Sequence, residues 1–170
     1  ILIAYKSTDQ HRSEIEVEYP KDILQLNRCW NIFSLNEAEI ASDFQLVTKS
    51  KKSQKISETN TVVGAENIFI EQGAVVECSI LNAQSGFIYI GKNAEIMEGS
   101  LVRGSLAMCE NSVLKMGSKI YGATTLGPYC NVGGEVNNSV FQGYSNKGHD
   151  GFLGNSVIGE WCNLGADTNN

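Results

Sequence analysis

The sequence predicts an all-β fold, a parallel β-helix preceded by one short helix. The main observation is an aliphatic residue or methionine at every sixth position, without a break, between residues 90 and 132. The residue four positions after each of these is mostly small. A helix repeats near 3.6 residues and a strand near 2, so a sustained period of six fits neither. Three flat sides of six residues would close each coil, with the aliphatic residue inside and the small residue at the corner. The aliphatic positions are Ile90, Ile96, Val102, Met108, Leu114, Ile120, Leu126 and Val132.

A helix is expected before the repeats. Ser34 followed by Glu37 has the capping-box spacing that begins a helix, and apolar residues continue from there to Val47. We predict a helix at about residues 34–47, long enough for about three turns and for packing against the first coils.

The domain plan follows from these elements. Residues 48–60 are polar and lack apolar periodicity, which is typical of a linker. We therefore divide the chain into a linker with its helix at residues 21–60 and a β-helix domain at residues 61–170. Because the chain begins with isoleucine and ends within a repeat, we expect it to be part of a longer polypeptide, with the β-helix incomplete at its C-terminal end.

The period of six slips in two places. Val132 and Ile158 are 26 residues apart, which is two more than four repeats. A slip in a solenoid indicates a segment that leaves the wall as a loop, and such loops carry binding residues. We predict such a loop at Ser139–Gly151, and a second one around Leu81–Phe87.

Composition excludes several classes of protein. A formal charge of -6 and a pI near 4.9 give no basic field for nucleic acid. No apolar run approaches the ~20 residues of a membrane span, and the first residues lack the features of a signal peptide, so we expect a cytoplasmic location. Five cysteines without a CxxC pair indicate reduced thiols, and neither a disulfide framework nor a zinc site. Cys130 and Cys162 occupy the small-residue position of the repeat, which favours packing over a nucleophilic role.

The stretch HDGFLGNSVIGEWCNLGADT, from His149 to Thr168, resembles a known motif. It is similar to H-x-x-Y-x-G-D-x-x-I-G-x-x-x-N-x-G-A-G-T in the left-handed, hexapeptide-repeat β-helix of bifunctional N-acetylglucosamine-1-phosphate uridylyltransferases/glucosamine-1-phosphate acetyltransferases. The resemblance implies a left-handed coil, a homotrimer with active sites between subunits, and an upstream nucleotidyltransferase domain, of which residues 1–20 are a candidate remnant. The matching residues are His149, Gly154, Ile158, Gly159, Asn163, Gly165, Ala166 and Thr168.

The same resemblance implies acetyl transfer from acetyl-CoA, as cosubstrate, to a hexosamine 1-phosphate. His149 would be the catalytic base, because a neutral imidazole titrates near the working pH, and Asp150 or a backbone carbonyl would orient it. No metal or covalent cofactor is expected here, and Mg²⁺ would serve only the upstream nucleotidyltransferase domain. Candidate contacts to the sugar phosphate are Tyr144, Lys147, Phe152 and Asn137. Candidate contacts to acetyl-CoA or to the oxyanion are Gly165, Ala166 and Asn163.

Departures from the motif keep a second interpretation open. The tyrosine of the motif is Phe152 here, its aspartate is Asn155, and its second glycine is Asp167. Loss of a hydroxyl and gain of a charge favour a non-catalytic trimerisation or regulatory module of a sugar-1-phosphate nucleotidyltransferase. On that interpretation His149 is an exposed turn residue, and Asn137 stacks at a corner of the coil.

Overall fold

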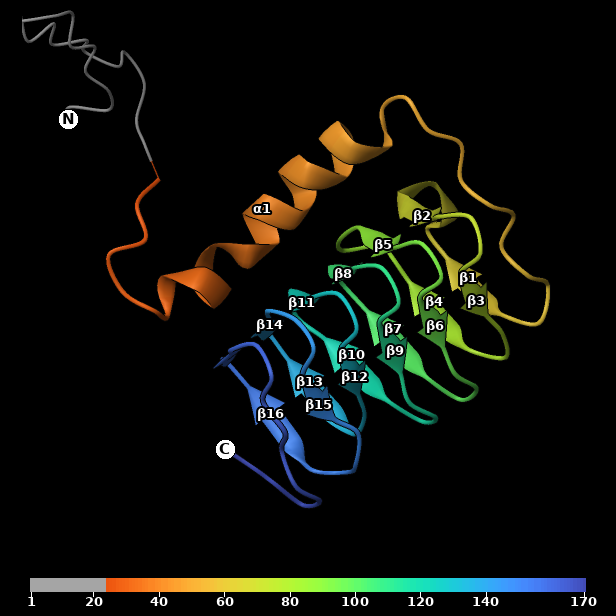
Figure 1. The fold of residues 1–170 in the computed structure, drawn as a ribbon. Helices are drawn as coiled ribbons and strands as arrows, with labels where there is room; N and C mark the ends of the chain where they lie inside the picture. Colours follow the sequence, from red (N-terminus) through yellow and green to blue (C-terminus); the bar gives the residue numbers. More distant parts are fainter. Residues whose placement is uncertain (1–23) are drawn as a thin grey trace, which may run out of the picture.

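The computed structural model describes residues 24–170, and the predicted remnant at residues 1–20 lies outside them. The described chain forms a parallel β-solenoid with three sheets and one α-helix packed on its outside (Figure 1). It is consistent with a left-handed β-helix, and the predicted fold class is confirmed.

The chain visits three faces of a prism in turn, so each strand pairs in parallel with the strand one coil away. The first face contains β1 (Thr61–Val63), β4 (Ile80–Asn82), β7 (Leu101–Arg103), β10 (Lys119–Tyr121), β13 (Glu135–Asn137) and β16 (Phe152–Gly154). The second face contains β2 (Ile68–Ile70), β5 (Ile88–Ile90), β8 (Leu106–Met108), β11 (Thr124–Leu126), β14 (Val140–Phe141) and β17 (Val157–Ile158). The third face contains β3 (Val75–Val76), β6 (Glu95–Ile96), β9 (Val113–Leu114), β12 (Asn131–Val132) and β15 (Asn146–Lys147), and a short 3-10 helix, Ala65–Asn67, precedes β2.

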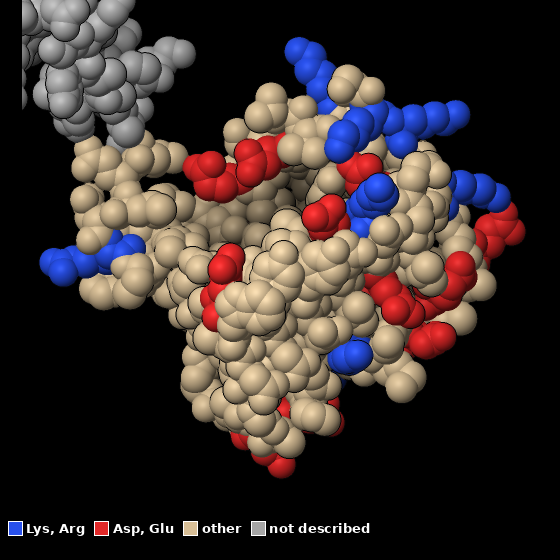
Figure 2. Space-filling view, viewed as in Figure 1, with Lys and Arg blue, Asp and Glu red and all other residues tan. Residues whose placement is uncertain are grey.

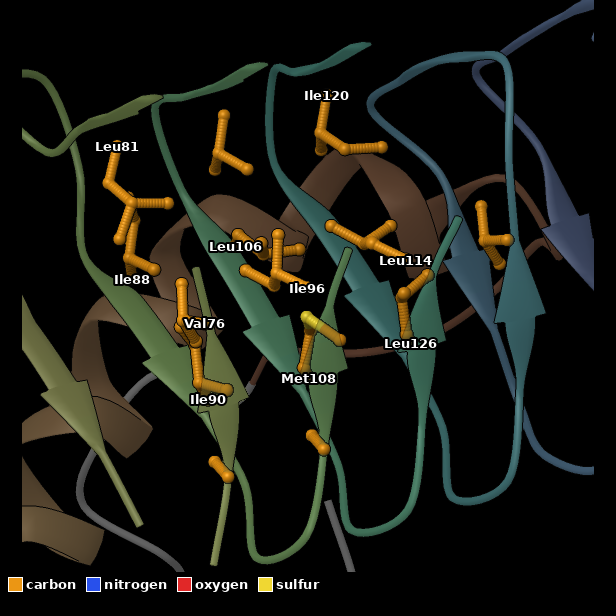
Figure 3. Close-up of a cluster of buried hydrophobic side chains, with 14 of the residues drawn as sticks. Val76, Leu81, Ile88, Ile90, Ile96, Leu106, Met108, Leu114, Ile120 and Leu126 are labelled. Atoms are coloured by element: carbon orange, nitrogen blue, oxygen red, sulfur yellow. The ribbon is translucent and has the colours of Figure 1, made fainter. Parts of the chain in front are cut away.

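The core is the column of residues that the period of six identifies. All eight predicted aliphatic positions are at most 2% exposed. Figure 3 shows the side chains of Ile90, Ile96, Met108, Leu114, Ile120 and Leu126 inside the prism. The residues four positions later are also fully buried, and the small ones among them, such as Ala94, Ser100 and Ser112, lie at the corners between strands. The serines find backbone partners: Ser100 donates to the carbonyl of Met97 at 2.8 Å, and Ser112 donates to that of Cys109 at 2.7 Å. The buried hydroxyl of Thr124 has no partner within residues 24–170.

The helix α1 (Asn31–Thr48) begins three residues earlier than predicted. The capping-box interpretation of Ser34 is wrong, because this residue lies within the first turn and its hydroxyl donates to the carbonyl of Trp30. The side chain of Asn31 instead accepts hydrogen bonds from the backbone N–H groups of Asn27 and Arg28, at 3.1 and 2.9 Å. Asn31, three residues before Ser34, therefore fixes the backbone at the start of the helix through its side chain.

Specific contacts hold α1 against the second face. The Asn36 amide donates to the carbonyl of Ala123 at 2.9 Å and accepts from the Thr125 hydroxyl at 2.8 Å, so a buried polar group is satisfied on both sides. Phe44 stacks on Phe87, with ring centroids 4.4 Å apart. The helix leaves a cavity of about 280 Å³ beneath it. Its walls are mostly apolar and Glu39 and Asp43 also line it; Figure 2 shows acidic side chains beside the hollow.

Residues 53–60, part of the predicted linker, make hydrogen bonds to the first coil of the solenoid. The Ser53 hydroxyl accepts from the N–H of Ile70 at 3.0 Å, and the N–H of Gln54 donates to the Ile70 carbonyl at 2.7 Å. Asn60 accepts from the N–H of Ser79 at 2.9 Å. These polar side chains cover the open edge of the first coil, which would otherwise expose unpaired backbone groups.

The predicted loop at Ser139–Gly151 is wrong. Its residues form β14 and β15, which pair with β11 and β12 in the wall of the prism. Leu126 aligns with Phe141 and Val132 with Lys147, so this coil has fifteen residues. Shorter corners absorb the slip because wall strands keep their backbone groups paired.

The second predicted loop is smaller than expected. Leu81 lies in β4 with no exposed surface, and the extra residues form a longer corner at residues 83–87 that brings Phe87 under α1. None of the helices in residues 24–170 combines the length and apolarity needed to cross a membrane.

Candidate functional site

His149 lies in a four-residue turn, Gly148–Gly151, at the corner between the third and first faces. β15 ends immediately before this turn and β16 begins immediately after it. His149 and Asp150 are exposed, and the imidazole makes no hydrogen bond to any residue in the described part of the chain. The ring is therefore open to a ligand, and neither Asp150 nor a carbonyl orients it in this state.

The turn of the next coil stacks directly on the His149 turn. The N–H of Asp167 donates to the carbonyl of Asp150 at 3.0 Å. A Cβ on Gly151 would lie 2.5 Å from the carbonyl oxygen of Thr168, so only glycine permits this approach. The residues of the motif that are far apart in sequence, His149 and the Gly165–Thr168 turn, thus meet at one corner.

Two backbone donors at this corner remain free. Among the described residues, the N–H groups of Gly165 and Ala166 have no acceptor, whereas those of Asp167 and Thr168 are both used. Both residues are exposed. Free backbone N–H groups are the donors that an oxyanion site uses, and these two lie on the turn that stacks against the His149 turn.

Two of the departures from the motif, Asn155 and Asp167, lie at positions with a left-handed backbone. Asp167 has a φ of 56° and Asn155 a φ of 46°, both in the left-handed region. Asp and Asn enter this region more readily than other residues with a side chain. Asp167 therefore keeps the turn where the motif has its second glycine, and it adds a carboxylate to the corner.

Phe152 and Asn137 lie on the first face, on neighbouring strands. Phe152 begins β16 directly after the His149 turn, and its ring lies over Gly154, where a Cβ would be 2.7 Å from Cζ. Asn137 pairs with Gly154, at the other end of that strand. Phe152 is thus adjacent to the corner, whereas Asn137 lies toward the opposite corner.

Asn163 belongs to the third face. It forms a bridge with Asn146, whose side-chain amide donates to the Asn163 side-chain oxygen at 2.7 Å. This ladder of amides orients Asn163 on the wall that leads to the Gly165–Thr168 turn.

Tyr144 lies at a different corner, between the second and third faces. Its ring is stacked between those of Tyr129 and Trp161, with centroids 5.3 and 4.6 Å away. Both faces of the Tyr144 ring are therefore covered, and only its edge and hydroxyl are open to a ligand. All three aromatic residues have a left-handed φ, so one corner position of three successive coils builds the stack.

We expect Tyr144→Ala to lower the free energy of unfolding by about 1–3 kcal/mol, because it removes two aromatic pairs. Alanine has the same difficulty as tyrosine at a positive φ, so the backbone contributes little to the difference. Tyr144→Phe keeps the stack and is the matched control. Urea titration of the three proteins checks this, and equal midpoints for all three would contradict it.

Lys147 is the least expected member of the candidate set. It aligns with Val132 in the inward column of the third face and is 1% exposed. Its ammonium donates to three backbone carbonyls, and we therefore leave it out of the candidate substrate contacts. The sequence does indicate that Lys147 points inward, because Phe141, Lys147 and Leu153 are spaced by six. A lysine at a position that is otherwise aliphatic makes this spacing easy to miss.

The cysteines and the possible metal ligands give no further candidate site in residues 24–170. All five cysteines lie within the described residues and are free thiols. Cys130 is fully buried, as its place in the repeat predicts, whereas Cys162, in the last coil, is exposed. No group of three His, Cys, Asp or Glu side chains suited to a metal ion occurs in residues 24–170.

Comparison with known protein families gives a match to the N-terminal part of the chain. A family model described as sugar nucleotidyl transferase matches residues 3–52, a minority of the chain that includes α1 and ends before β1. No curated protein matches the chain. The match marks this part as similar to sugar nucleotidyl transferases, and together with the solenoid fold it supports a β-helix module related to sugar-nucleotide chemistry.

Proposed function

We propose that this β-helix is the acyltransferase part of a sugar-phosphate nucleotidyltransferase, and that it transfers acetyl from acetyl-CoA to the amine of a hexosamine 1-phosphate. Nucleotidyl transfer would belong to an upstream domain. The observation that carries the proposal is the corner where the turn of exposed His149 stacks on the turn that holds the free N–H groups of Gly165 and Ala166.

Each group at this corner has a defined part in the reaction. The amine nitrogen attacks the thioester carbonyl carbon, and neutral His149 takes the proton that the nitrogen loses. The N–H groups of Gly165 and Ala166 donate to the oxyanion of the tetrahedral intermediate. The C–S bond then breaks, the oxyanion becomes the amide carbonyl, and the imidazolium returns its proton to the thiolate of CoA. Phe152 supplies an apolar wall beside the sugar.

A homotrimer is part of the proposal, with the site completed by a neighbouring subunit. Ile80 and Leu101 are neighbours in register on the first face, and they are 45% and 44% exposed. The second face is partly covered by α1 (Figure 1), and the third face exposes Val75, at 50%. We assign side-by-side packing to the first face, because two of its exposed apolar side chains are adjacent in register.

We expect Leu101→Asp to convert a trimer into a monomer, because the carboxylate would be buried without a partner. Light scattering after size exclusion measures the mass directly. Met116→Asp is the matched control, since Met116 is 71% exposed but lies at a corner instead of on the first face. A Leu101→Asp protein with unchanged mass would contradict assembly through this face.

A second function has its own support. The Phe152 ring offers no hydroxyl to a sugar, and Asp167 adds a carboxylate beside the proposed oxyanion site, where it would oppose negative charge. Both features favour a trimerisation or regulatory module without acyl transfer.

An assay of the full-length protein, including the proposed upstream domain, for both activities separates the two functions. Thiol release from acetyl-CoA is followed with and without glucosamine 1-phosphate, and sugar-nucleotide formation is followed in parallel. Acetyl-CoA turnover that requires the amine supports the proposed function. Nucleotidyl transfer without any acetyl transfer would reject it in favour of the regulatory module.

A further inference from the structure

We propose that Lys147 is a positioning residue, which acts from inside the solenoid by tying the His149 turn to the coil below it. This inference rests on the proposed function of His149. Lys147 is a buried titratable group that the proposed chemistry does not use, and its ammonium contacts the backbone of the His149 turn.

The ammonium connects two consecutive corners. It donates to the carbonyl of Gly133, in the preceding coil, at 3.0 Å. It also donates to the carbonyls of His149 and Gly151, in its own turn, at 3.1 and 2.9 Å. An ammonium has three protons, so this cation is fully used and has none left for a substrate.

The carbonyls depend on Lys147 in turn. Within residues 24–170, the carbonyls of Gly133 and His149 accept from no other donor, whereas that of Gly151 also accepts from the N–H of Glu135 at 3.1 Å. A buried carbonyl without a donor is costly, so a change at Lys147 frees the backbone of the histidine itself.

The neighbouring glycine shows how closely the corner is fitted around the ammonium. Gly134 has a φ of +75°, and a Cβ there would lie 3.0 Å from Nζ of Lys147, 3.0 Å from the His149 carbonyl oxygen and 2.8 Å from that of Gly151. Gly117 occupies the same corner one coil earlier, with a φ of +70°, and a Cβ there would meet nothing within 4 Å. The two positions thus share their backbone conformation but not the tether.

This pair of glycines gives a matched test of positioning. Gly134→Ala pushes on the ammonium and its carbonyls without removing a polar group, and Gly117→Ala imposes the same φ strain in open space. We expect Lys147→Met and Gly134→Ala each to lower kcat for acetyl transfer at least tenfold, with KM for acetyl-CoA changed less than threefold. Gly117→Ala should keep kcat within twofold.

Two readouts separate positioning from general loss of stability. If Lys147 acts through His149, adding Lys147→Met to His149→Ala lowers kcat by less than a further twofold. The amides of Glu135 and Asp167 donate to the carbonyls of Gly151 and Asp150, so their hydrogen exchange reports on the turn. We expect exchange at both, in Lys147→Met and Gly134→Ala, to accelerate at least tenfold more than at the Leu101 amide, which is bonded to Ser118 and reports on the stability of the wall.

Losses that multiply in the double variant would overturn the inference, as would equal kcat losses in Gly117→Ala and Gly134→Ala. Unchanged exchange at Glu135 and Asp167 would also overturn it. If Lys147→Met does not fold, Gly134→Ala against Gly117→Ala decides the question. If the wild-type protein transfers no acetyl group, the proposed function fails, and the exchange rates alone decide whether Lys147 tethers the turn.

Discussion

Replacing His149 by alanine is expected to lower kcat for acetyl transfer by about 10²–10⁴-fold, the usual contribution of a general base. The imidazole is exposed and makes no hydrogen bond within the described residues, so its removal leaves the packing of the solenoid intact. We expect the midpoint of thermal unfolding to stay within about 1 °C, because an exposed side chain contributes little to stability.

His149→Gln and His11→Gln complete this comparison. Glutamine keeps a polar side chain at the turn but cannot take a proton, so it should be as slow as alanine. His11 is the other histidine in the sequence, and its replacement should leave acetyl transfer unchanged. Partial recovery of His149→Ala by added imidazole would support the role of base; full activity in His149→Gln would contradict it.

Replacing Lys147 by methionine is expected to lower the free energy of unfolding by about 2–4 kcal/mol at neutral pH. Methionine fills the inward column, but it leaves the carbonyls of Gly133 and His149 without a donor. Relief of the buried charge offsets only part of this loss, because the ammonium is hydrogen-bonded three times.

The stability difference should also depend on pH. Burial lowers the pKa of Lys147 from its usual 10.5, and the nearby Asp150 carboxylate partly opposes this. Between the lowered pKa and 10.5 the unfolded chain binds more protons than the folded protein, so the folded state gains stability as pH rises. Lys147→Met lacks this gain.

Urea titrations of both proteins at several pH values test this. The wild-type advantage over Lys147→Met should widen as pH rises toward about 10.5, and it should be constant below the lowered pKa. An advantage that shrinks over this range would show that the folded state favours the charged lysine. Leu114→Ala, in the same inward column two coils earlier, should give a pH-independent difference.

The regular part of the fold could be predicted from sequence because its signal is repetitive. Eight aliphatic positions at a spacing of six leave one architecture in which all of them are buried, and the structure buries all eight. The helix could be predicted as an element, but its start could not, because Asn31 binds backbone N–H groups upstream of the expected cap.

The break in the repeat could not be interpreted correctly from sequence. Counting from Val132 to Ile158 gives a surplus of two residues, which suggests an inserted loop, whereas the coil is shortened to fifteen residues. The coil is three residues shorter than the eighteen that three repeats of six give, and this shift puts Lys147 into the core. A pattern of hydrophobic residues gives no reason to expect a lysine there. The stacking of the His149 turn on the Gly165–Thr168 turn depends on that register. The residues of the candidate site could therefore be predicted from the motif, but their arrangement in space could not.

The central claim is that His149 is the base of an acetyl transfer at this corner. The most direct measurement incubates the protein with acetyl-CoA carrying a labelled acetyl group and glucosamine 1-phosphate, and follows the labelled product by mass spectrometry, wild type beside His149→Ala. We expect labelled N-acetylglucosamine 1-phosphate from the wild type and a rate at least about a hundredfold lower from the variant. No product from the wild type, or equal rates from both proteins, would contradict the claim.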